Sequence, residues 1–319
     1  MEQSLERFGS MKALVTGGAG FIGSNLVDQL IDDGNDVFIF DDLSSGKSEN
    51  INPKAWFDYQ VDIADVSPHV VAWMNTFVSD NDIDVIFHLA AKARVQPSIE
   101  DPIGFNETNV NGTLNLLKAA VDAKVDRFVF TSSSSVYGNV QITPTDEYHI
   151  ADPLSPYGAQ KLIGEVYCKQ FYRTYGLRST CLRYFNVYGE RQLLEGAYSL
   201  VMGKFIQQRL NGEPMTIRGD GEQRRDFTYV GDVVKANILA ALSENPLASE
   251  GTPINIGNGD NRSVNEIADM IGGDRINVDA VLEPRETLSD NTKALNLLDW
   301  VPRGDIETWI QGYKKEVGL

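Results

Sequence analysis

Cysteine and histidine are scarce in this sequence, which contains two cysteines and three histidines among 319 residues. Cys168 and Cys181 fall in an expected helix and an expected strand without a paired spacing. We therefore expect buried free thiols and no disulfide. His69, His88 and His149 are scattered along the chain, which disfavours a metal site, and we expect none.

Basic residues and long apolar runs are also in short supply. Lys and Arg number 28 against 45 Asp and Glu, a formal net charge of -17. A nucleic acid or an anionic membrane requires a basic face, so we expect neither partner. No apolar run reaches the ~18 residues of a membrane span, and the start of the chain lacks the pattern of a secretory leader. We therefore expect a cytoplasmic protein whose residues 1–10 form a frayed tail.

Short β-rich runs alternate with helical patterns in the first half of the chain. The amphipathic stretches 105–123 and 157–175 have the spacing of long helices. This alternation predicts βαβ units and an α/β fold with a Rossmann-like, doubly wound parallel sheet. The expected strands are 12–16, 36–40, 84–91, 127–133 and 178–185.

The alternation of strand and helix patterns becomes less regular in the second half of the chain. One short strand, 215–217, and one helix that begins at a capping box of Ser263 and Glu266 are indicated there. We expect a dinucleotide-binding domain at 11–185 and a smaller substrate-binding region at 186–319. Strands from the later part of the chain are expected to return to the sheet of the first domain.

A glycine-rich turn, TGGAGFIG, joins the first expected strand to the first expected helix. Its glycines let a pyrophosphate approach the backbone, and the helix amino terminus offers N–H donors. Asp41 follows Gly17 by 24 residues, where a carboxylate accepts from a ribose hydroxyl and repels a 2′-phosphate. The motif therefore predicts NAD in preference to NADP. The expected contacts are Gly17, Gly20, Phe21, Ile22, Asp41 and Asp42.

Two further features belong to this pattern. Asp62 and Ile63 are expected at the adenine, although an Asp at a strand end is as often a cap. Tyr157 and Lys161 are four residues apart and share a helix face. A phenol has a pKa near 10, so a basic role at neutral pH requires about 4 kcal/mol of phenolate stabilisation. An adjacent ammonium and an oxidised nicotinamide both favour the phenolate.

Several motifs in one order resemble a known family. The chain resembles the extended short-chain dehydrogenase/reductases, and within them the UDP-sugar 4-epimerases of the UDP-glucose/UDP-N-acetylglucosamine type. The resemblance runs from Met11 to about Pro302 and implies bound NAD, a UDP-sugar substrate and 4-epimerisation through a transient 4-keto sugar. The motifs are TGGAGFIG, HLAA, NVNGT, SSSSVYG, SPYGAQK, RYFNVYG and GDGEQRRDFTYVGDV.

The resemblance also implies roles for individual residues. Ser133 lies beside the catalytic Tyr157 with Lys161, and Thr287 is the position whose size decides whether a 2-acetamido group fits. Arg285 or Arg275 is expected to replace an arginine of the family pattern that is missing here. The cofactor contacts implied are Leu89, Ala90, Ala91, Tyr157, Lys161 and Tyr184. The substrate contacts implied are Asn109, Ser133, Asn186, Ser199, Leu200, Thr216, Arg218 and Arg225.

The serine run of SSSSVYG separates this chain from two related reaction types. Related dehydratases carry an acid and a base at the positions of Ser134 and Ser135, and decarboxylating relatives need a Glu at Ser135. A hydroxyl is too weak an acid to expel a hydroxyl leaving group. We therefore expect an active-site floor without elimination chemistry.

Alternatives remain open at this stage. A UDP-glucuronate 4-epimerase or another sugar-nucleotide reductase uses the same residues, with Arg94 as a basic group near the sugar. A non-catalytic NAD-binding protein is a third alternative, but such proteins usually lose the Tyr/Lys pair. The resemblance also implies a homodimer, in which the helices 105–123 and 157–175 form a four-helix bundle.

Overall fold

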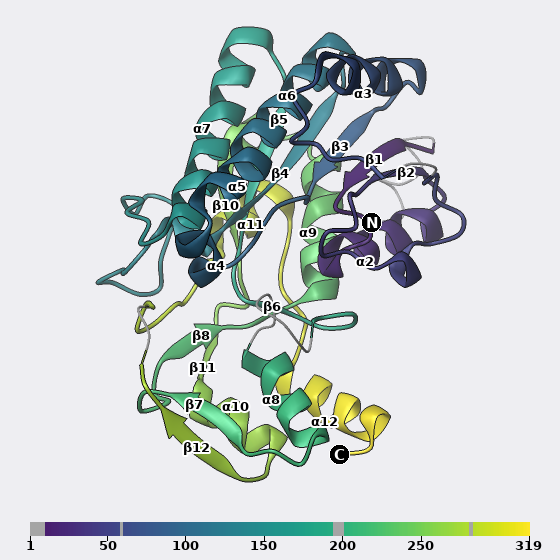
Figure 1. The fold of residues 1–319 in the computed structure, drawn as a ribbon. Coiled ribbons are helices and arrows are strands. Elements are labelled where there is room, and N and C mark those ends of the chain that lie inside the picture. The colour runs from purple at the N-terminus through teal and green to yellow at the C-terminus, as the bar shows by residue number, and fades with distance from the viewer. Residues whose placement is uncertain (1–9, 58–59, 194–200, 281–282) are drawn as a thin grey trace.

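A six-stranded parallel sheet, ordered β10-β5-β4-β3-β1-β2, forms the centre of the protein (Figure 1). The sheet confirms the predicted doubly wound fold. Its strand order reverses between β1 and β3, and ligands bind at such a reversal. The strands are β1 (Lys12–Thr16), β2 (Asp36–Phe40), β3 (Val85–His88), β4 (Arg127–Ser133), β5 (Ser179–Tyr184) and β10 (Glu250–Ile256). The computed structural model describes residues 10–57, 60–193, 201–280 and 283–319.

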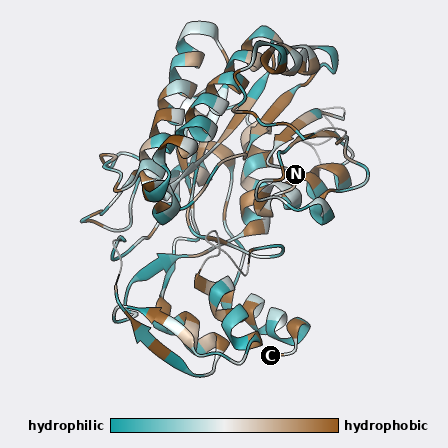
Figure 2. Ribbon diagram, in the orientation of Figure 1, coloured by the Kyte–Doolittle hydropathy of each residue, from teal (hydrophilic) through white to brown (hydrophobic). Residues whose placement is uncertain are grey.

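Helices cover both faces of this sheet (Figure 1). One face packs on α3, α6 and α7 around the buried rings of Phe128 and Phe130. The other face packs on α2 and α9, where Leu26 and Val233 are buried. Figure 2 shows the strands between these layers as largely hydrophobic, as a sheet buried on both faces requires. The helices are α2 (Phe21–Asp32), α3 (Pro68–Asp80), α6 (Thr113–Asp122), α7 (Pro156–Tyr175), α9 (Val230–Leu242) and α11 (Thr292–Leu298).

The helix expected at 105–123 is present, but its middle is π-helical. The Thr113 hydroxyl donates to the Asn109 carbonyl at 2.7 Å, in the wide turn. Hydrophobic spacing does not distinguish such a turn from a regular one, so the sequence did not reveal it. This region consists of α4 (Val95–Glu100), α5 (Pro102–Asn106), the π-helix η2 (Glu107–Gly112) and α6.

The second half of the chain holds more strands than the one expected at 215–217. The most important is β10, which returns to the edge of the central sheet beside β5. It contains Gly251 and Pro253, which weaken a strand pattern but are tolerated at a sheet edge. The other strands pair as β6 (Val187–Tyr188) with β9 (Thr228–Tyr229), β7 (Met215–Arg218) with β12 (Arg275–Val278), and β8 (Arg224–Asp226) with β11 (Asn261–Ser263).

A smaller lobe, built around its own apolar cluster, lies below the central sheet in Figure 1. The predicted capping box of Ser263 and Glu266 is confirmed at the start of α10. Cys168 and Cys181 are buried free thiols, as predicted. Within the described ranges, every helix is too short or too polar to cross a membrane. The lobe's helices are α8 (Val201–Leu210), α10 (Val264–Ile271) and α12 (Ile306–Val317), and the 3-10 turns of the whole fold are η1 (Ser48–Asn50), η3 (Ser134–Val136) and η4 (Pro246–Ala248).

Candidate active site

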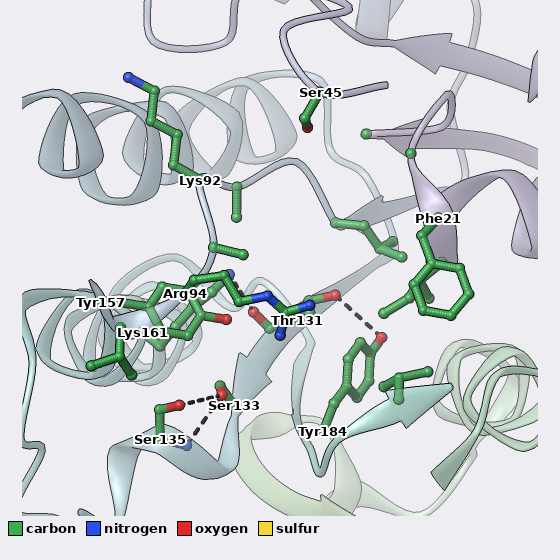
Figure 3. Close-up of a pocket in the computed structure, with 18 of the residues that line it drawn as sticks. Phe21, Ser45, Lys92, Arg94, Thr131, Ser133, Ser135, Tyr157, Lys161 and Tyr184 are labelled. Carbon is green, nitrogen blue, oxygen red and sulfur yellow. Dashed lines mark hydrogen bonds between the residues drawn. The ribbon is translucent and has the colours of Figure 1, made fainter. Parts of the chain in front are cut away.

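A cavity of about 590 Å³ lies at the carboxyl ends of the central strands (Figure 3). Its walls come from the β1–α2 turn, from the ends of β3, β4 and β5, and from the first turns of α7. The smaller lobe closes one side with Arg225 and Thr287. This is the position at which a doubly wound sheet binds its ligand.

The glycine-rich turn forms a cradle with no room for side chains. Gly17 has φ of +73°, and a Cβ there would lie 2.8 Å from the Ala90 nitrogen. A Cβ on Gly23 would lie 2.1 Å from the Gly17 carbonyl oxygen. Gly20 directly precedes α2, so the amino terminus of that helix faces the turn. The cradle fits a pyrophosphate, because backbone N–H groups and the helix dipole favour an anion there.

The predicted ribose-binding carboxylate lies at the far side of this cradle. Asp41 is buried, and its carboxylate accepts from the backbone N–H of Ala19 at 2.9 Å and of Leu43 at 2.8 Å. Burial raises the pKa of Asp41. Asp62 lines the same wall and also accepts from the Ala64 N–H at 2.8 Å. The residues present therefore fit NAD. The predicted cofactor contacts Gly17, Gly20, Phe21, Ile22, Asp41, Asp42, Asp62, Ile63, Leu89, Ala90, Ala91, Tyr157, Lys161 and Tyr184 all line the cavity.

Ser133, Tyr157 and Lys161 meet on the cavity floor, although they come from different elements (Figure 3). Ser133 ends β4, and its hydroxyl lies near enough to the Tyr157 phenol to lower the pKa of that phenol. Lys161 Nζ donates to the Thr131 carbonyl at 2.8 Å and lies 5.9 Å from the centre of the Tyr157 ring. The helical spacing of four residues thus aims both α7 side chains at the end of β4.

Burial dominates the electrostatics of this trio. It raises the pKa of Tyr157, while the Ser133 hydroxyl and the positive charge of Arg94 lower it. Burial also lowers the pKa of Lys161 to about 7. Arg94, which the sequence analysis placed near the sugar, thus also acts on the Tyr157 phenol.

The serine run at the end of β4 turns across the cavity floor. The Ser133 hydroxyl lies 3.1 Å from the Ser135 hydroxyl and accepts from the Ser135 backbone N–H, also at 3.1 Å. Ser134 and Ser135 line the cavity as well. These contacts make the segment a hydroxyl-bearing floor and not a slack linker.

Two side chains border the floor from opposite sides (Figure 3). The Tyr184 hydroxyl accepts from Thr131 Oγ1 at 3.2 Å and donates to Asn237 Oδ1 at 2.9 Å. Arg94 precedes α4 with φ of +89°, a left-handed conformation that is uncommon for a residue with a side chain. Its side chain extends across the cavity between Tyr157 and Tyr184 in Figure 3.

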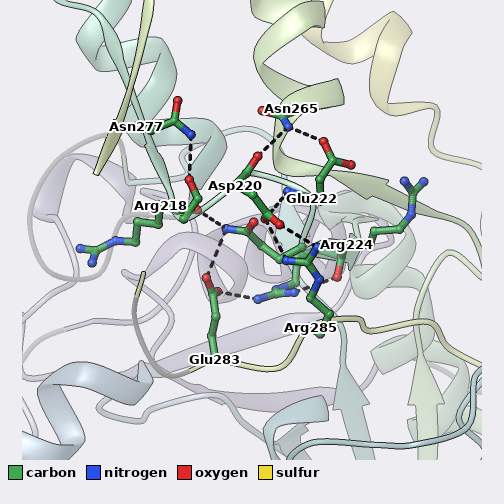
Figure 4. A network of polar contacts seen from close by, with 11 residues as sticks. Arg218, Asp220, Glu222, Arg224, Asn265, Asn277, Glu283 and Arg285 are labelled. Carbon is green, nitrogen blue, oxygen red and sulfur yellow. Dashed lines mark hydrogen bonds and ion pairs between the residues drawn. The ribbon is translucent and has the colours of Figure 1, made fainter. Parts of the chain in front are cut away.

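The predicted substrate residues divide into two groups. Arg94, Ser133, Asn186, Arg225 and Thr287 line the cavity. Arg225 forms an ion pair of 2.5 Å with Glu283, another lining residue, and Figure 4 shows the surrounding polar network.

The second group does not reach the cavity walls. Asn109 is buried, and its side-chain amide bonds to the backbone of Lys92 and to Gln160. Thr216 bonds to Gln208, Arg218 ends β7, and Arg285 pairs with Asp220 at 2.8 Å (Figure 4). Ser199 and Leu200 lie outside the described residues.

Gln192 is among the lining residues that the sequence analysis did not predict. Its side chain is 8% exposed, and neither amide atom has a hydrogen-bond partner among the described residues. Gln192 lines the same cavity as the predicted site residues. Gln192 lies in an irregular segment, and periodicity carries no signal for such a residue.

Comparisons with known proteins agree with this geometry. Residues 13–257 match the model of the family described as "NAD dependent epimerase/dehydratase family". A relative from Methanocaldococcus jannaschii, named putative UDP-glucose 4-epimerase, is 44% identical over 259 residues, which cover 81% of this chain and 80% of the relative.

Two solved structures are similar over nearly the whole chain. A Thermotoga maritima UDP-glucose 4-epimerase with UDP-glucose is 38% identical, with a TM-score of 0.88 and coverage of 96% of this chain and 100% of that one. A Methanobrevibacter ruminantium UDP-N-acetylglucosamine 4-epimerase in complex with UDP-N-acetylmuramic acid is 37% identical, with a TM-score of 0.88 and coverage of 97% and 98%. With the glycine cradle and the Ser/Tyr/Lys trio in one cavity, the chain belongs to the NAD dependent epimerase/dehydratase family.

Proposed function

We propose that this protein is an NAD-dependent UDP-sugar 4-epimerase. The observation that carries the proposal is the meeting of Ser133, Tyr157 and Lys161 on the floor of a cavity that the glycine cradle also lines. The names of the similar enzymes support the same reaction. The proposed substrates are UDP-glucose and UDP-galactose, together with their N-acetylated counterparts.

The protein's own residues account for the proton transfer. Tyr157 takes the proton from the sugar 4′-hydroxyl, and Ser133 holds that hydroxyl and the phenol in line through hydrogen bonds. Lys161 and Arg94 favour the phenolate. NAD, when bound, supplies the group that accepts a hydride from the sugar carbon and returns it. Ser134 and Ser135 offer no strong acid, so the floor does not support loss of water.

Inversion at one carbon requires the sugar to turn over while the nucleotide stays bound. The binding energy should therefore reside on the UDP group. We assign UDP contacts to Asn186 and Arg225, which lie on the cavity wall. Thr287 is a small side chain on the same wall, and it leaves room for a 2-acetamido group.

One observation favours a second candidate substrate. Arg94 extends into the cavity beside Tyr157 (Figure 3). A guanidinium there would pair with the carboxylate of a UDP-glucuronate. A UDP-glucuronate 4-epimerase is thus the alternative to be tested beside the main proposal.

A homodimer in the cytoplasm is also part of the proposal. Helices α5, α6 and α7 run side by side (Figure 1). Of these, α5 and α7 carry exposed apolar side chains, with Ile103 74% and Val166 53% exposed. Exposed apolar side chains on adjacent helices are typical of a self-association surface. Free cysteines, such as Cys168 and Cys181, are typical of a reducing compartment.

The function is tested by separate incubation with UDP-glucose, UDP-N-acetylglucosamine and UDP-glucuronate, followed by chromatographic resolution of the 4-epimers. We expect UDP-galactose and UDP-N-acetylgalactosamine from the first two. Turnover of UDP-glucuronate alone would select the alternative. No turnover of any of the three, by protein that contains NAD, would refute epimerisation.

A further inference from the structure

A buried carboxylate lies behind the catalytic trio, one helical turn beyond Lys161. Glu165 of α7 is 6% exposed. Its Oε1 accepts from the hydroxyl of Ser132 at 2.5 Å and from Arg183 Nε at 2.8 Å. Its Oε2 accepts from Arg183 Nη2 at 2.7 Å. Since Ser132 directly precedes Ser133, the carboxylate holds the backbone that carries a catalytic hydroxyl.

These contacts occur where α7 lies closest to β4. A Cβ on Gly164 would lie 2.2 Å from Cζ of Phe130, and a Cβ on Gly158 would lie 2.5 Å from the Ser135 carbonyl oxygen. The glycines therefore let the helix pack directly on the Phe130 ring of β4 and on the backbone of the turn η3 that follows it. At such a distance, a small displacement of the helix changes the distance between Tyr157 and Ser133.

The ion pair extends the connection to two further strands. The guanidinium of Arg183, on β5, lies 4.7 Å from the centre of the Tyr137 ring. The Tyr137 hydroxyl donates to Asn255 Oδ1, on β10, at 2.7 Å. One set of contacts thus joins the catalytic helix to β4, β5 and β10.

Stability alone does not account for this arrangement. Arg183 is 4% exposed, so both charges are taken out of water, and the desolvation cost offsets much of their attraction. Apolar residues of similar volume would stabilise the same contact between helix and sheet as well or better. A directional contact, however, fixes relative position more tightly than apolar packing does.

We infer that Glu165 is a positioning residue for the epimerisation proposed above. Through Ser132 and Arg183 it holds the end of β4 in register with the first turns of α7, so that Ser133 remains beside Tyr157 on the cavity floor. A misplacement of about 1 Å costs on the order of 100-fold in rate.

The test separates positioning from stability by replacing both members of the ion pair. In the Glu165→Met/Arg183→Leu variant no buried charge is left unpaired, so we expect a melting temperature close to that of the wild type. We expect kcat to fall at least ~10-fold while KM for the UDP-sugar stays within ~3-fold, because only the reacting groups are displaced. Ser132→Ala removes one contact without a charge change and should lower kcat in the same way.

A crystal structure of each variant supplies a readout that does not depend on turnover. We expect the distance from Ser133 Oγ to the Tyr157 hydroxyl to increase by about 1 Å relative to the wild type. A folded double variant with an unchanged Ser133–Tyr157 distance and with kcat within ~3-fold of the wild type would overturn the inference. If the double variant does not fold, Ser132→Ala decides by the same two measurements. A wild type without activity on any UDP-sugar would refute the proposed function, and the crystal structures would then decide the role of Glu165.

Discussion

The Tyr157 side chain lies where burial opposes its ionisation, and Ser133 and Arg94 favour it. We predict that Tyr157→Phe lowers kcat by at least ~100-fold, because removal of the phenol removes the proposed base. Epimer formation is measured by chromatography, and NAD content is measured in the denatured extract of the same preparation. NAD content and melting temperature should match the wild type. Activity within tenfold of the wild type would place the base elsewhere.

The single residue His88 makes the free energy of unfolding depend on pH. It is enclosed between Thr16 and Thr113, with both ring nitrogens 2.8 Å from a hydroxyl, and burial lowers its pKa to about 3. An unfolded His has a pKa near 6.5, so between pH 6.5 and about 3 only the unfolded chain is protonated at this residue. Neutral His88 therefore makes its full contribution to the free energy of unfolding above pH ~6.5. Below that pH the contribution falls by about 1.4 kcal/mol per pH unit.

We predict that His88→Gln removes this contribution from the pH dependence. Urea unfolding of both proteins between pH 7 and pH 4 gives the free energies of unfolding. The difference in the free energy of unfolding between wild type and variant should shrink as the pH falls. A constant difference across this range would mean that His88 is protonated in the folded protein.

Thr287 sets the size of the sugar pocket in the proposed function. Its Oγ1 accepts from the Asp226 N–H at 3.2 Å, and the residue lines the cavity. We predict that Thr287→Tyr lowers kcat/KM for UDP-N-acetylglucosamine by roughly 10- to 200-fold, because the larger ring occupies the space of the acetamido group. UDP-glucose should be spared, and Thr287→Ser, which stays small, should affect neither. An equal loss of kcat/KM on both substrates would mean that another residue sets the size of the pocket.

At the scale of elements, the contact between α7 and β4 depends on a glycine. A Cβ at position 164 would overlap the buried ring of Phe130. We predict that Gly164→Ala lowers the free energy of unfolding by about 1–3 kcal/mol, because the overlap outweighs the better helix propensity of Ala. The matched control is Gly312→Ala in α12, where a Cβ meets nothing within 4 Å. It should be neutral or stabilising by up to ~1 kcal/mol. Equal effects of the two substitutions in urea unfolding would contradict the close packing.

At the scale of the whole molecule, the exposed apolar side chains of α5 and α7 predict self-association. We expect light scattering at micromolar concentration to give about twice the chain mass of 35.3 kDa. Ile163→Asp combined with Val166→Asp should yield a monomer, because both substitutions place charge on the proposed interface. Ile150, which is 88% exposed in a loop, provides the control, and Ile150→Asp should remain dimeric. A monomeric wild type would refute the dimer.

The sequence by itself predicted the features that depend on local chemistry. The glycine turn before Phe21 has the backbone that was expected, because Gly adopts the positive φ of Gly17 without strain and leaves room for the close approach at Gly23. The central strands and the long helix of α7 followed from periodicity. Tyr157 and Lys161 share a face because a helix places side chains four residues apart side by side.

Only the tertiary structure decided which distant segments meet. The edge strand β10 joins β5 because the later chain returns to the sheet, and the glycine and proline it contains gave no strand signal. The side-chain amide of Asn109 bonds to Lys92 and Gln160, which are 17 and 51 residues away in the sequence, and Gln192 lines the cavity although its segment has no periodic pattern. Burial also lowers the pKa of Lys161, because desolvation depends on every segment that covers a side chain and not on its neighbours in sequence.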